Sequence, residues 1–173
     1  MQYCYCLFCE TKRCKKVASV LEMSGISRAF SPQIVKRQRK NGKNVELLFD
    51  FLPGYIFAFT NTPINDVSLL RIDGVIRVLG KPSQRYCLQG EDRTFALNLL
   101  KKNGIIDAIR ILRTGDNVMF SVESFFGSEG TIVQIDYRKQ RAKVMFPFAG
   151  TSCSSWVACS IIDVTNNLLY EDR

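Results

Sequence analysis

The sequence contains no histidine. Without an imidazole there is no Ser-His-Asp or Cys-His catalytic arrangement and no zinc site that uses histidine. Two common nucleotide-binding loops, G-x-x-x-x-G-K-[ST] and G-x-G-x-x-G, are absent as well. These absences exclude most familiar enzyme chemistry, so we expect a binding protein that catalyses no reaction and needs no cofactor.

Long apolar runs are missing too. No stretch approaches the roughly 18 apolar residues of a membrane span. The apolar segment from Tyr3 to Phe8 is short and lacks a basic region before it, so it does not resemble a secretory signal. Seven cysteines is an odd number, which rules out complete pairing in intramolecular disulfides. We therefore expect a cytoplasmic protein with reduced thiols and no membrane partner.

Basic side chains outnumber acidic ones by 24 to 16, which gives a net charge of +8. The excess lies mainly in residues 1–50, which hold ten basic and four acidic side chains, whereas residues 111–173 hold six and seven. An uneven basic charge indicates a polyanionic partner such as nucleic acid. The alternative is a charge that only keeps the protein soluble.

The first part of the chain alternates between strand and helix patterns. Tyr3–Cys9 is typical of a buried strand. Thr11 is placed to cap a helix over residues 12–23, and Gly25 is placed to end it. The apolar residues of this helix recur at i, i+3, i+4 and i+7, which predicts a buried face of Cys14, Val17, Ala18 and Leu21.

The pattern continues to about residue 105. A turn at Asn41-Gly42 predicts a hairpin over 34–49, and strands are expected at 55–59 and 74–80. Two more helices are predicted: one capped by Thr62, with Pro63 at its first position, and one over 91–103 that ends at Gly104. Their inward residues would be Ile64, Val67 and Leu70 in the first, and Phe95, Ala96, Leu99 and Leu100 in the second.

These elements predict an α+β domain over 1–106, with an antiparallel sheet flanked by helices. Residues 107–112 are expected to be a linker. Beyond them, short β-like runs separated by glycine turns predict a small barrel over 113–173. The expected strands are 118–122, 131–137, 142–146, 156–158 and 161–164.

Several segments together resemble the NusG family of transcription elongation factors. Leu52-Pro53-Gly54-Tyr55-Ile56-Phe57 is similar to the proline-glycine-tyrosine strand of that family, and Gly74 to Gly80 to its glycine-valine strand. Gly115-Asp116-x-Val118 followed by Phe125-x-Gly127-x-x-Gly130-Thr131-Ile132 resembles a KOW motif. Each motif alone is weak, but the ordered set covers nearly the whole chain.

The resemblance implies a two-domain transcription factor. Its N-terminal domain would dock on the clamp of RNA polymerase, and its SH3-like KOW barrel would contact nascent RNA or a protein partner. On matching positions, the polymerase-binding residues would be Phe8, Lys16, Tyr55 and Phe57, and Phe125 would bind a partner. Cys4-Tyr5 stands where the family commonly has tryptophan-tyrosine, and Glu123-Ser124 where it has glycine-proline. These departures resemble a specialised paralogue, an antiterminator of the LoaP or RfaH type.

Two basic clusters are candidates for nucleic-acid contact, because basic arms seek phosphates. One surrounds the predicted hairpin turn: Lys36, Arg37, Arg39, Lys40 and Lys43. The other is expected at a hairpin tip in the barrel: Arg138, Lys139, Arg141 and Lys143. Nascent RNA, including a leader hairpin, is the expected ligand, with DNA as an open alternative. Either cluster could instead be solvated surface.

Period-two alternation places Cys4 and Cys6 on one face of the predicted first strand and Cys9 near its end, and Cys14 follows in the sequence. Zinc sites typically present paired cysteines from a tight C-x₂₋₄-C turn, so we expect buried apolar thiols and no metal. The combined interpretation is a monomeric antitermination factor. One rival is a KOW-containing RNA-binding or ribosome-associated protein that does not bind polymerase. A second rival is a thiol-based redox or metal protein that uses the N-terminal cysteines.

Overall fold

The computed structural model describes residues 2–40, 43–114, 117–120 and 130–163. The chain divides into two compact units: Met1–Gln33 with Asp50–Ile106, and Ile34–Phe49 with Asp107–Arg173. The Asn41-Gly42 turn and Phe125 lie outside the described residues, as do the side chains of Arg37, Arg39, Lys40 and Lys43. None of the described helices has the length and apolar character needed to cross a membrane.

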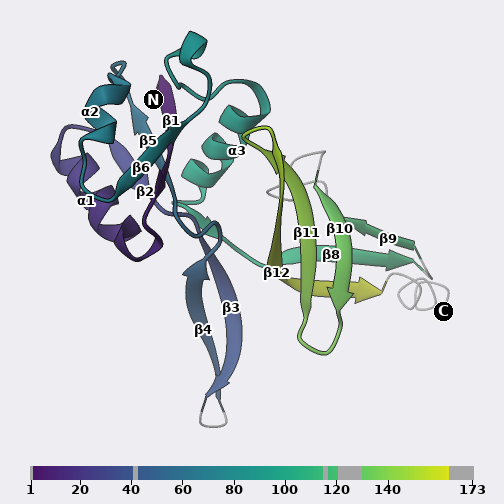
Figure 1. The fold of residues 1–173 in the computed structure, drawn as a ribbon. Coiled ribbons are helices and arrows are strands. Elements are labelled where there is room, and N and C mark those ends of the chain that lie inside the picture. Colours follow the sequence, from purple (N-terminus) through teal and green to yellow (C-terminus); the bar gives the residue numbers. More distant parts are fainter. Residues whose placement is uncertain (1, 41–42, 115–116, 121–129, 164–173) are drawn as a thin grey trace, which may run out of the picture. The chain divides into compact units, whose positions relative to one another are not determined.

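The first unit is built on a four-stranded antiparallel sheet with the order β2-β5-β1-β6 (Figure 1). The strands are β1 (Tyr3–Cys9), β2 (Arg28–Phe30), β5 (Tyr55–Thr60) and β6 (Val75–Leu79). Three of the four strands, β1, β5 and β6, were predicted, and those predictions are confirmed. The short β2 was not predicted.

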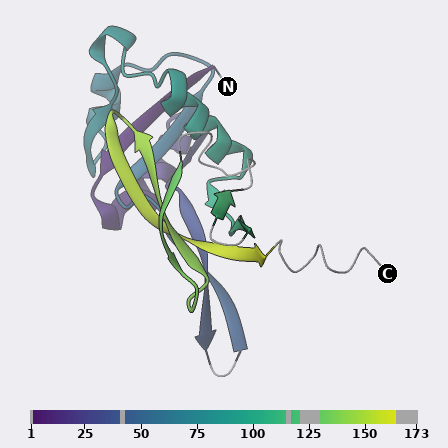
Figure 2. The ribbon, with the colours of Figure 1, turned by 90° about the vertical axis from the view of Figure 1, so that its right-hand side faces the viewer.

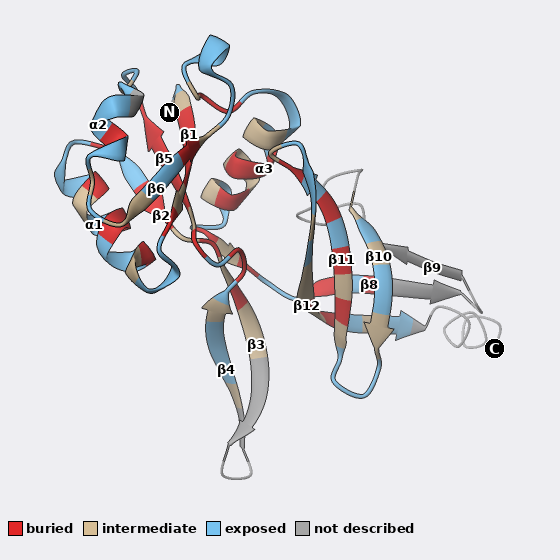
Figure 3. Ribbon diagram, viewed as in Figure 1, coloured by how far each residue is buried: buried red, intermediate tan, exposed pale blue. Residues whose placement is uncertain are grey.

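Helices cover both faces of this sheet, with α1 (Cys14–Met23) and α2 (Asp66–Leu70) on one side and α3 (Gly90–Lys101) on the other (Figure 1). Side chains alternate between the two faces along a strand. Tyr5 and Leu7 of β1 therefore join the α1 side, where they pack with Val17 and Leu21. The buried residues of each helix face the sheet, and their outer sides are exposed (Figure 3).

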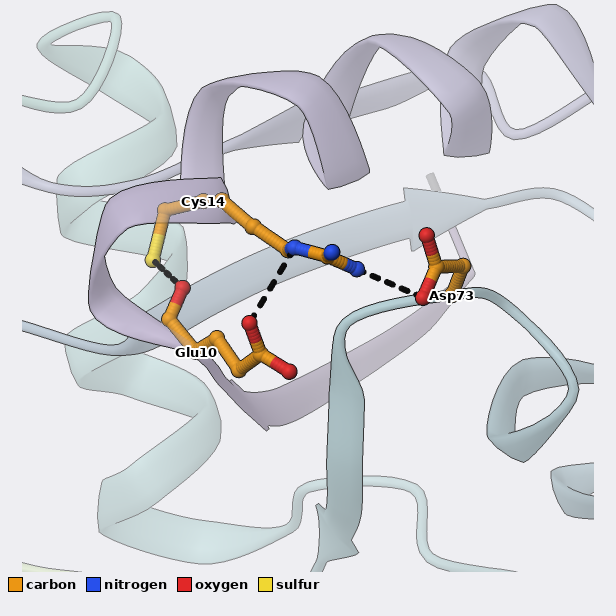
Figure 4. A network of polar contacts seen from close by, with 4 residues as sticks. Glu10, Cys14 and Asp73 are labelled. Carbon is orange, nitrogen blue, oxygen red and sulfur yellow. Dashed lines mark hydrogen bonds and ion pairs between the residues drawn. The ribbon is translucent and has the colours of Figure 1, made fainter.

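The predicted start of the first helix is wrong, although its buried face is confirmed. Residues Thr11–Arg13 form a 3₁₀ turn without a side-chain cap, and the α-helix begins only at Cys14. Arg13 makes ion pairs from Nε to Glu10 (3.1 Å) and from Nη1 to Asp73 (2.6 Å), which tie this turn to the segment before β6 (Figure 4). These tertiary contacts stabilise a local geometry that a capping rule does not anticipate.

The second helix also starts later than predicted. Asn65, rather than Thr62, is the N-cap, and its Oδ1 accepts a hydrogen bond from the Val67 amide at 3.0 Å. The later start changes the buried face, so that Leu69 is 2% exposed whereas Val67 and Leu70 are 48% and 45% exposed. Both asparagine and threonine are good N-cap residues, so residue preference alone does not decide between Thr62 and Asn65.

The third helix is confirmed, and three of its four predicted inward residues, Phe95, Ala96 and Leu99, are buried. The fourth, Leu100, is half-buried, and the helix ends at Lys101, two residues before its predicted end. The predicted hairpin is also confirmed as β3 (Gln33–Lys40) and β4 (Lys43–Asp50). These two strands belong to a separate sheet with the order β4-β3-β7, where β7 is Ile105–Ile106.

The second unit contains a five-stranded sheet with the order β10-β11-β12-β8-β9. Its strands are β8 (Ile109–Thr114), β9 (Asn117–Phe120), β10 (Thr131–Asp136), β11 (Arg141–Phe148) and β12 (Thr151–Asp163). Residues 109–112 of the expected linker are thus part of a strand, because Ile109 and Ile111 alternate inward and are buried.

The two strands expected at 156–158 and 161–164 are one strand, β12, which bends along its length (Figures 1 and 2). Residues 151–158 pair antiparallel with β11, and residues 159–163 pair parallel with β8. Because it bends, β12 pairs with β11 along its first part and with β8 along its second part. The prediction of two separate strands is therefore wrong.

Candidate functional site

Three side chains meet at one corner of the four-stranded sheet, which we call the aromatic corner: Phe8, Tyr55 and Arg77. Phe8 and Tyr55 are direct cross-strand partners, and their rings meet edge to face with centroids 5.3 Å apart. Arg77 is the partner of Phe8 on the other side, with its guanidinium 5.4 Å from the Phe8 centroid. Phe8 and Tyr55 are half-buried and Arg77 is exposed, so the corner presents aromatic surface beside a cation.

The turn before Tyr55 shapes this corner. Leu52-Pro53-Gly54-Tyr55 closes with a hydrogen bond from the Tyr55 amide to the Leu52 carbonyl, with Gly54 at φ +89°. A Cβ atom on Gly54 would lie 2.9 Å from the Phe8 ring and 3.0 Å from the Cys9 carbonyl oxygen. Proline at the second turn position and glycine at the third are the preference of a type II turn. Glycine therefore lets the backbone pass close behind Phe8.

Phe57 is not part of the exposed corner, contrary to the prediction that it binds polymerase. It lies on the same sheet face as Tyr55 but is 0% exposed, with its ring centroid 6.0 Å from that of Phe95 on α3. Phe57 lies two residues after Tyr55 on β5, where α3 covers this face of the sheet, so its side chain belongs to the core. Phe57 is therefore a packing residue.

Lys16 is exposed on α1, and α1 covers the opposite face of the sheet from Phe57 and α3. The structure does not group it with the aromatic corner. Arg77, in contrast, was not selected from the sequence. The sequence shows that Arg77 lies on the strand between Gly74 and Gly80. Only the pairing register of that strand shows that Arg77 lies next to Phe8.

A second candidate surface lies on the five-stranded sheet. Along β11, Ala142, Val144 and Phe146 are buried, so Arg141 and Lys143 lie on the other face. The β10–β11 turn spans Tyr137 to Gln140 and carries the exposed Arg138 and Lys139. Two of the four predicted cations thus sit at the turn, whereas Arg141 and Lys143 are half-buried on a strand rather than at the hairpin tip.

Asp136 organises this turn. Its Oδ1 accepts a hydrogen bond from the Lys139 amide and its Oδ2 one from Arg141 Nε, both at 3.1 Å. The Lys139 amide, and then the bond and charge of Arg141, lower the pKa of the Asp136 carboxyl. The Arg141 guanidinium lies 4.4 Å from the ring centroid of Trp156, a residue that sequence reasoning did not select. Asp136 therefore holds the Arg141 side chain close to the Trp156 ring.

In the predicted basic hairpin the structure describes the side chain of Lys36, which is half-buried with its Nζ 4.8 Å from the Phe49 ring centroid. A nucleic-acid role for Arg37, Arg39, Lys40 and Lys43 remains a prediction.

The cysteines are buried thiols, with Cys153 half-buried. Burial raises the pKa of Cys4 and of Cys9 to about 12. Among the described residues, no three cysteine, aspartate or glutamate side chains are grouped so that they could hold a metal ion.

This arrangement predicts selective alkylation. In native protein at pH 8, iodoacetamide should modify Cys153 first, because the other six cysteines are buried, and Cys4 and Cys9 are also held as thiols. Peptide mass spectrometry over a time course measures the order, with urea-unfolded protein as the control in which all seven react. Early modification of Cys4 or Cys9 would contradict the prediction and favour a reactive-thiol role.

Comparison with known proteins shows the family to which the chain belongs and the fold that it resembles. A family model described as "Transcription termination factor nusG" matches residues 2–95, just over half of the chain. The chain belongs to the NusG family. A solved structure titled "Domain interaction in Thermotoga maritima NusG" aligns over 90% of this chain and 93% of its own length, with a TM-score of 0.50. At 14% sequence identity this likeness shows a NusG-like α+β fold. A search of curated proteins gave no match.

Family membership identifies the protein as a transcription termination or elongation factor and agrees with the expectation that it is not an enzyme, since NusG proteins are transcription factors without catalytic activity. The matched residues include the aromatic corner.

Proposed function

We propose that this NusG-family protein is a specialised antiterminator, of the LoaP or RfaH type, that docks on the clamp of RNA polymerase through the aromatic corner. The observation that carries the proposal is the pair of half-buried rings, Phe8 and Tyr55, flanked by the exposed Arg77. Aromatic residues and arginine are enriched among the residues that dominate binding energy at protein interfaces. Phe57 supports this surface from within the core.

The C-terminal segment would act as a KOW domain. Its five strands, of which β8 begins at Ile109, and the Gly130-Thr131-Ile132 start of β10 suit a small SH3-like barrel that extends the expected 113–173 domain by β8, joined to an N-terminal domain of residues 1–106. In this proposal Arg138, Lys139, Arg141 and Lys143 contact nascent RNA, with a leader hairpin as the first ligand to test. Phe125 and the basic hairpin would add contacts to a partner and to nucleic acid. The protein would act as a cytoplasmic monomer.

Polymerase binding tests the docking surface. Phe8→Ala and Tyr55→Ala should each weaken binding to purified core RNA polymerase by about 30-fold, since truncating an aromatic hot spot costs about 2 kcal/mol. Leu70→Ala is the matched control, because Leu70 is an exposed apolar side chain on the opposite face of the sheet, and it should bind like the wild type. Biolayer interferometry gives the affinities, and a thermal melt of each variant shows whether it remains folded.

The rival function has its own outcome in the same experiment. A wild-type chain that fails to bind polymerase but co-purifies with ribosomal subunits would indicate a KOW-containing ribosome-associated protein. Equal losses for Leu70→Ala and Tyr55→Ala would remove the aromatic corner as the docking surface.

A further inference from the structure

The pairing register gathers basic residues around the only tryptophan of the chain. Lys143 of β11 is the direct cross-strand partner of Trp156 on β12, and Arg141 lies two residues along β11, with its guanidinium over the Trp156 ring. On the far side of β12, Arg110 of β8 pairs with Ser160. We call this surface the tryptophan face and define it as Arg110, Arg141, Lys143 and Trp156.

These four side chains point the same way. The alternate residues Ala142, Val157, Cys159 and Ile111 are buried under the opposite face of the sheet, so Arg110, Arg141, Lys143 and Trp156 lie outside. The surface is hollowed, and its lining includes Arg110, Arg141 and Trp156 together with the turn residues Arg138 and Lys139. Sequence spacing could not show this, because Arg110 and Trp156 are far apart in the chain.

The charge of the hollow is positive on balance, because five cations line it (Lys36, Arg110, Arg138, Lys139 and Arg141) against two acids, Glu46 and Asp107. Asp136 is the one acidic side chain described on β8, β10, β11 and β12, and it already accepts hydrogen bonds from Lys139 and Arg141. A half-buried indole with a guanidinium over its ring gives a flat platform of fixed orientation. Cations beside an aromatic platform are the combination that binds single-stranded nucleic acid, with phosphates on the charges and bases on the rings.

We propose that the tryptophan face binds single-stranded RNA, with one base stacked on the Arg141–Trp156 pair and phosphates held by Arg110, Arg138 and Lys143. This inference rests on the RNA contact of the proposed function. It differs in the ligand, which is an unpaired RNA segment and not a hairpin. A duplex hides the faces of its bases, whereas an unpaired segment can present one to a platform on a sheet. The site is thus centred on the face of the sheet, with Arg138 of the β10–β11 turn at its edge.

The lone tryptophan makes the test direct, because the intrinsic indole fluorescence of the intact chain comes from Trp156 alone. The probe is a fluorescein-labelled, unstructured 12-nucleotide RNA, compared with a hairpin RNA and with single-stranded DNA of the same sequence. Binding should quench Trp156 and raise the anisotropy of the label at the same RNA concentrations. If three phosphates are contacted, log K against log salt should slope by about −2 for a single strand.

Substitutions separate stacking from charge. Trp156→Ala should weaken RNA binding by about 5- to 150-fold, the range for losing one base–aromatic stack, whereas Trp156→Phe should restore most of the affinity measured by anisotropy. Arg141→Lys keeps the charge but loses the planar group, so it should weaken binding at every salt concentration. Lys102→Ala, an exposed cation in the first unit, is the control and should change little. Thermal melts check that each variant is folded.

Each outcome has a defined consequence. RNA binding without quenching, with Trp156→Ala equal to wild type, overturns the stacking site but leaves RNA contact standing. Tighter binding to the hairpin than to the single strand also overturns it, in favour of recognition by shape. Absence of RNA binding by a chain that still binds polymerase overturns the RNA proposal alone, and polymerase docking through the aromatic corner is then unaffected.

Discussion

Phe57→Ala should destabilise the first unit by about 3–5 kcal/mol, the usual cost of removing a buried phenylalanine ring. The ring is completely buried between Phe30 and Phe95, at centroid distances of 6.5 Å and 6.0 Å. Removing it deletes contacts to both β2 and α3 and leaves a cavity that a sheet strand cannot close by collapse. Because small domains are stable by only about 5–15 kcal/mol, this one change should leave a marginally folded protein.

The comparison variant is Tyr55→Ala, two positions earlier on the same face of β5. Tyr55 is half-buried, so less apolar area returns to water and the stability cost should be smaller than for Phe57→Ala. Urea denaturation followed by far-UV circular dichroism measures both. A wild-type midpoint for Phe57→Ala, or a larger loss for Tyr55→Ala, would mean that the boundary between core and exposed corner is misplaced. Phe57→Leu should recover much of the stability by refilling the site.

This pair of residues shows where sequence reasoning succeeds and where it stops. Period-two alternation places Tyr55 and Phe57 on one face of a strand, and the register confirms that they share that face. The alternation cannot show which part of the strand is covered by α3 and which part is left exposed. That depends on packing between α3 and the sheet, elements separated by about thirty residues, so the assignment of Phe57 to a docking surface was wrong.

The misplaced helix starts have a more local cause. Thr62-Pro63 and Asn65 each satisfy a capping rule, and the choice between them is decided by tertiary contacts. The Ile64 amide, for example, donates a hydrogen bond to the buried Tyr5 hydroxyl at 3.0 Å, which fixes the segment before Asn65 in a non-helical conformation. Local propensity gives the existence of the helix, and this contact helps to set its first residue.

The basic surface of the second unit illustrates the same limit at longer range. The cluster Arg138 to Lys143 is visible in the sequence, but its neighbours are not. Trp156 comes beside Lys143 only through the β11–β12 register, and Arg110 comes beside Ser160 only through a parallel pairing with β8. Parallel pairs join segments distant in the chain, and no turn signal marks them. Trp156 and Arg110, two of the four residues of the tryptophan face, were therefore found only in the structure.

Gly54→Ala is expected to disrupt both the fold near the aromatic corner and polymerase docking. At φ +89° an alanine is strained by about 1–2 kcal/mol. Its Cβ would also lie 2.9 Å from the Phe8 ring and 3.0 Å from the Cys9 carbonyl oxygen. The ring can rotate or move outward, but the carbonyl is backbone and belongs to the sheet. Phe8 should be displaced from its edge-to-face contact with Tyr55.

Gly25→Ala is the matched control for this change. Gly25 has φ +93°, and an added Cβ there meets nothing within 4 Å. It follows α1 in a Schellman arrangement, with the Gly25 amide bonded to the Glu22 carbonyl and the Ile26 amide to the Leu21 carbonyl, each at 3.2 Å. The two alanines therefore share the conformational strain, and only the one at position 54 adds the clash beside Phe8.

The difference in stability and affinity between the two variants measures the effect of the close contact between residue 54 and the Phe8 ring. Gly25→Ala should lose about 1–2 kcal/mol of stability and keep wild-type affinity for polymerase, whereas Gly54→Ala should lose more stability and weaken polymerase binding at temperatures where it is still folded. Urea denaturation and interferometry on the same preparations provide the two numbers. If both variants lose equal stability and both keep their affinity, Gly54 serves only the turn, and the position of Phe8 does not govern docking. If Gly54→Ala alone loses affinity, the turn before Tyr55 positions the ring that contacts polymerase, which explains why a proline-glycine turn precedes the docking strand.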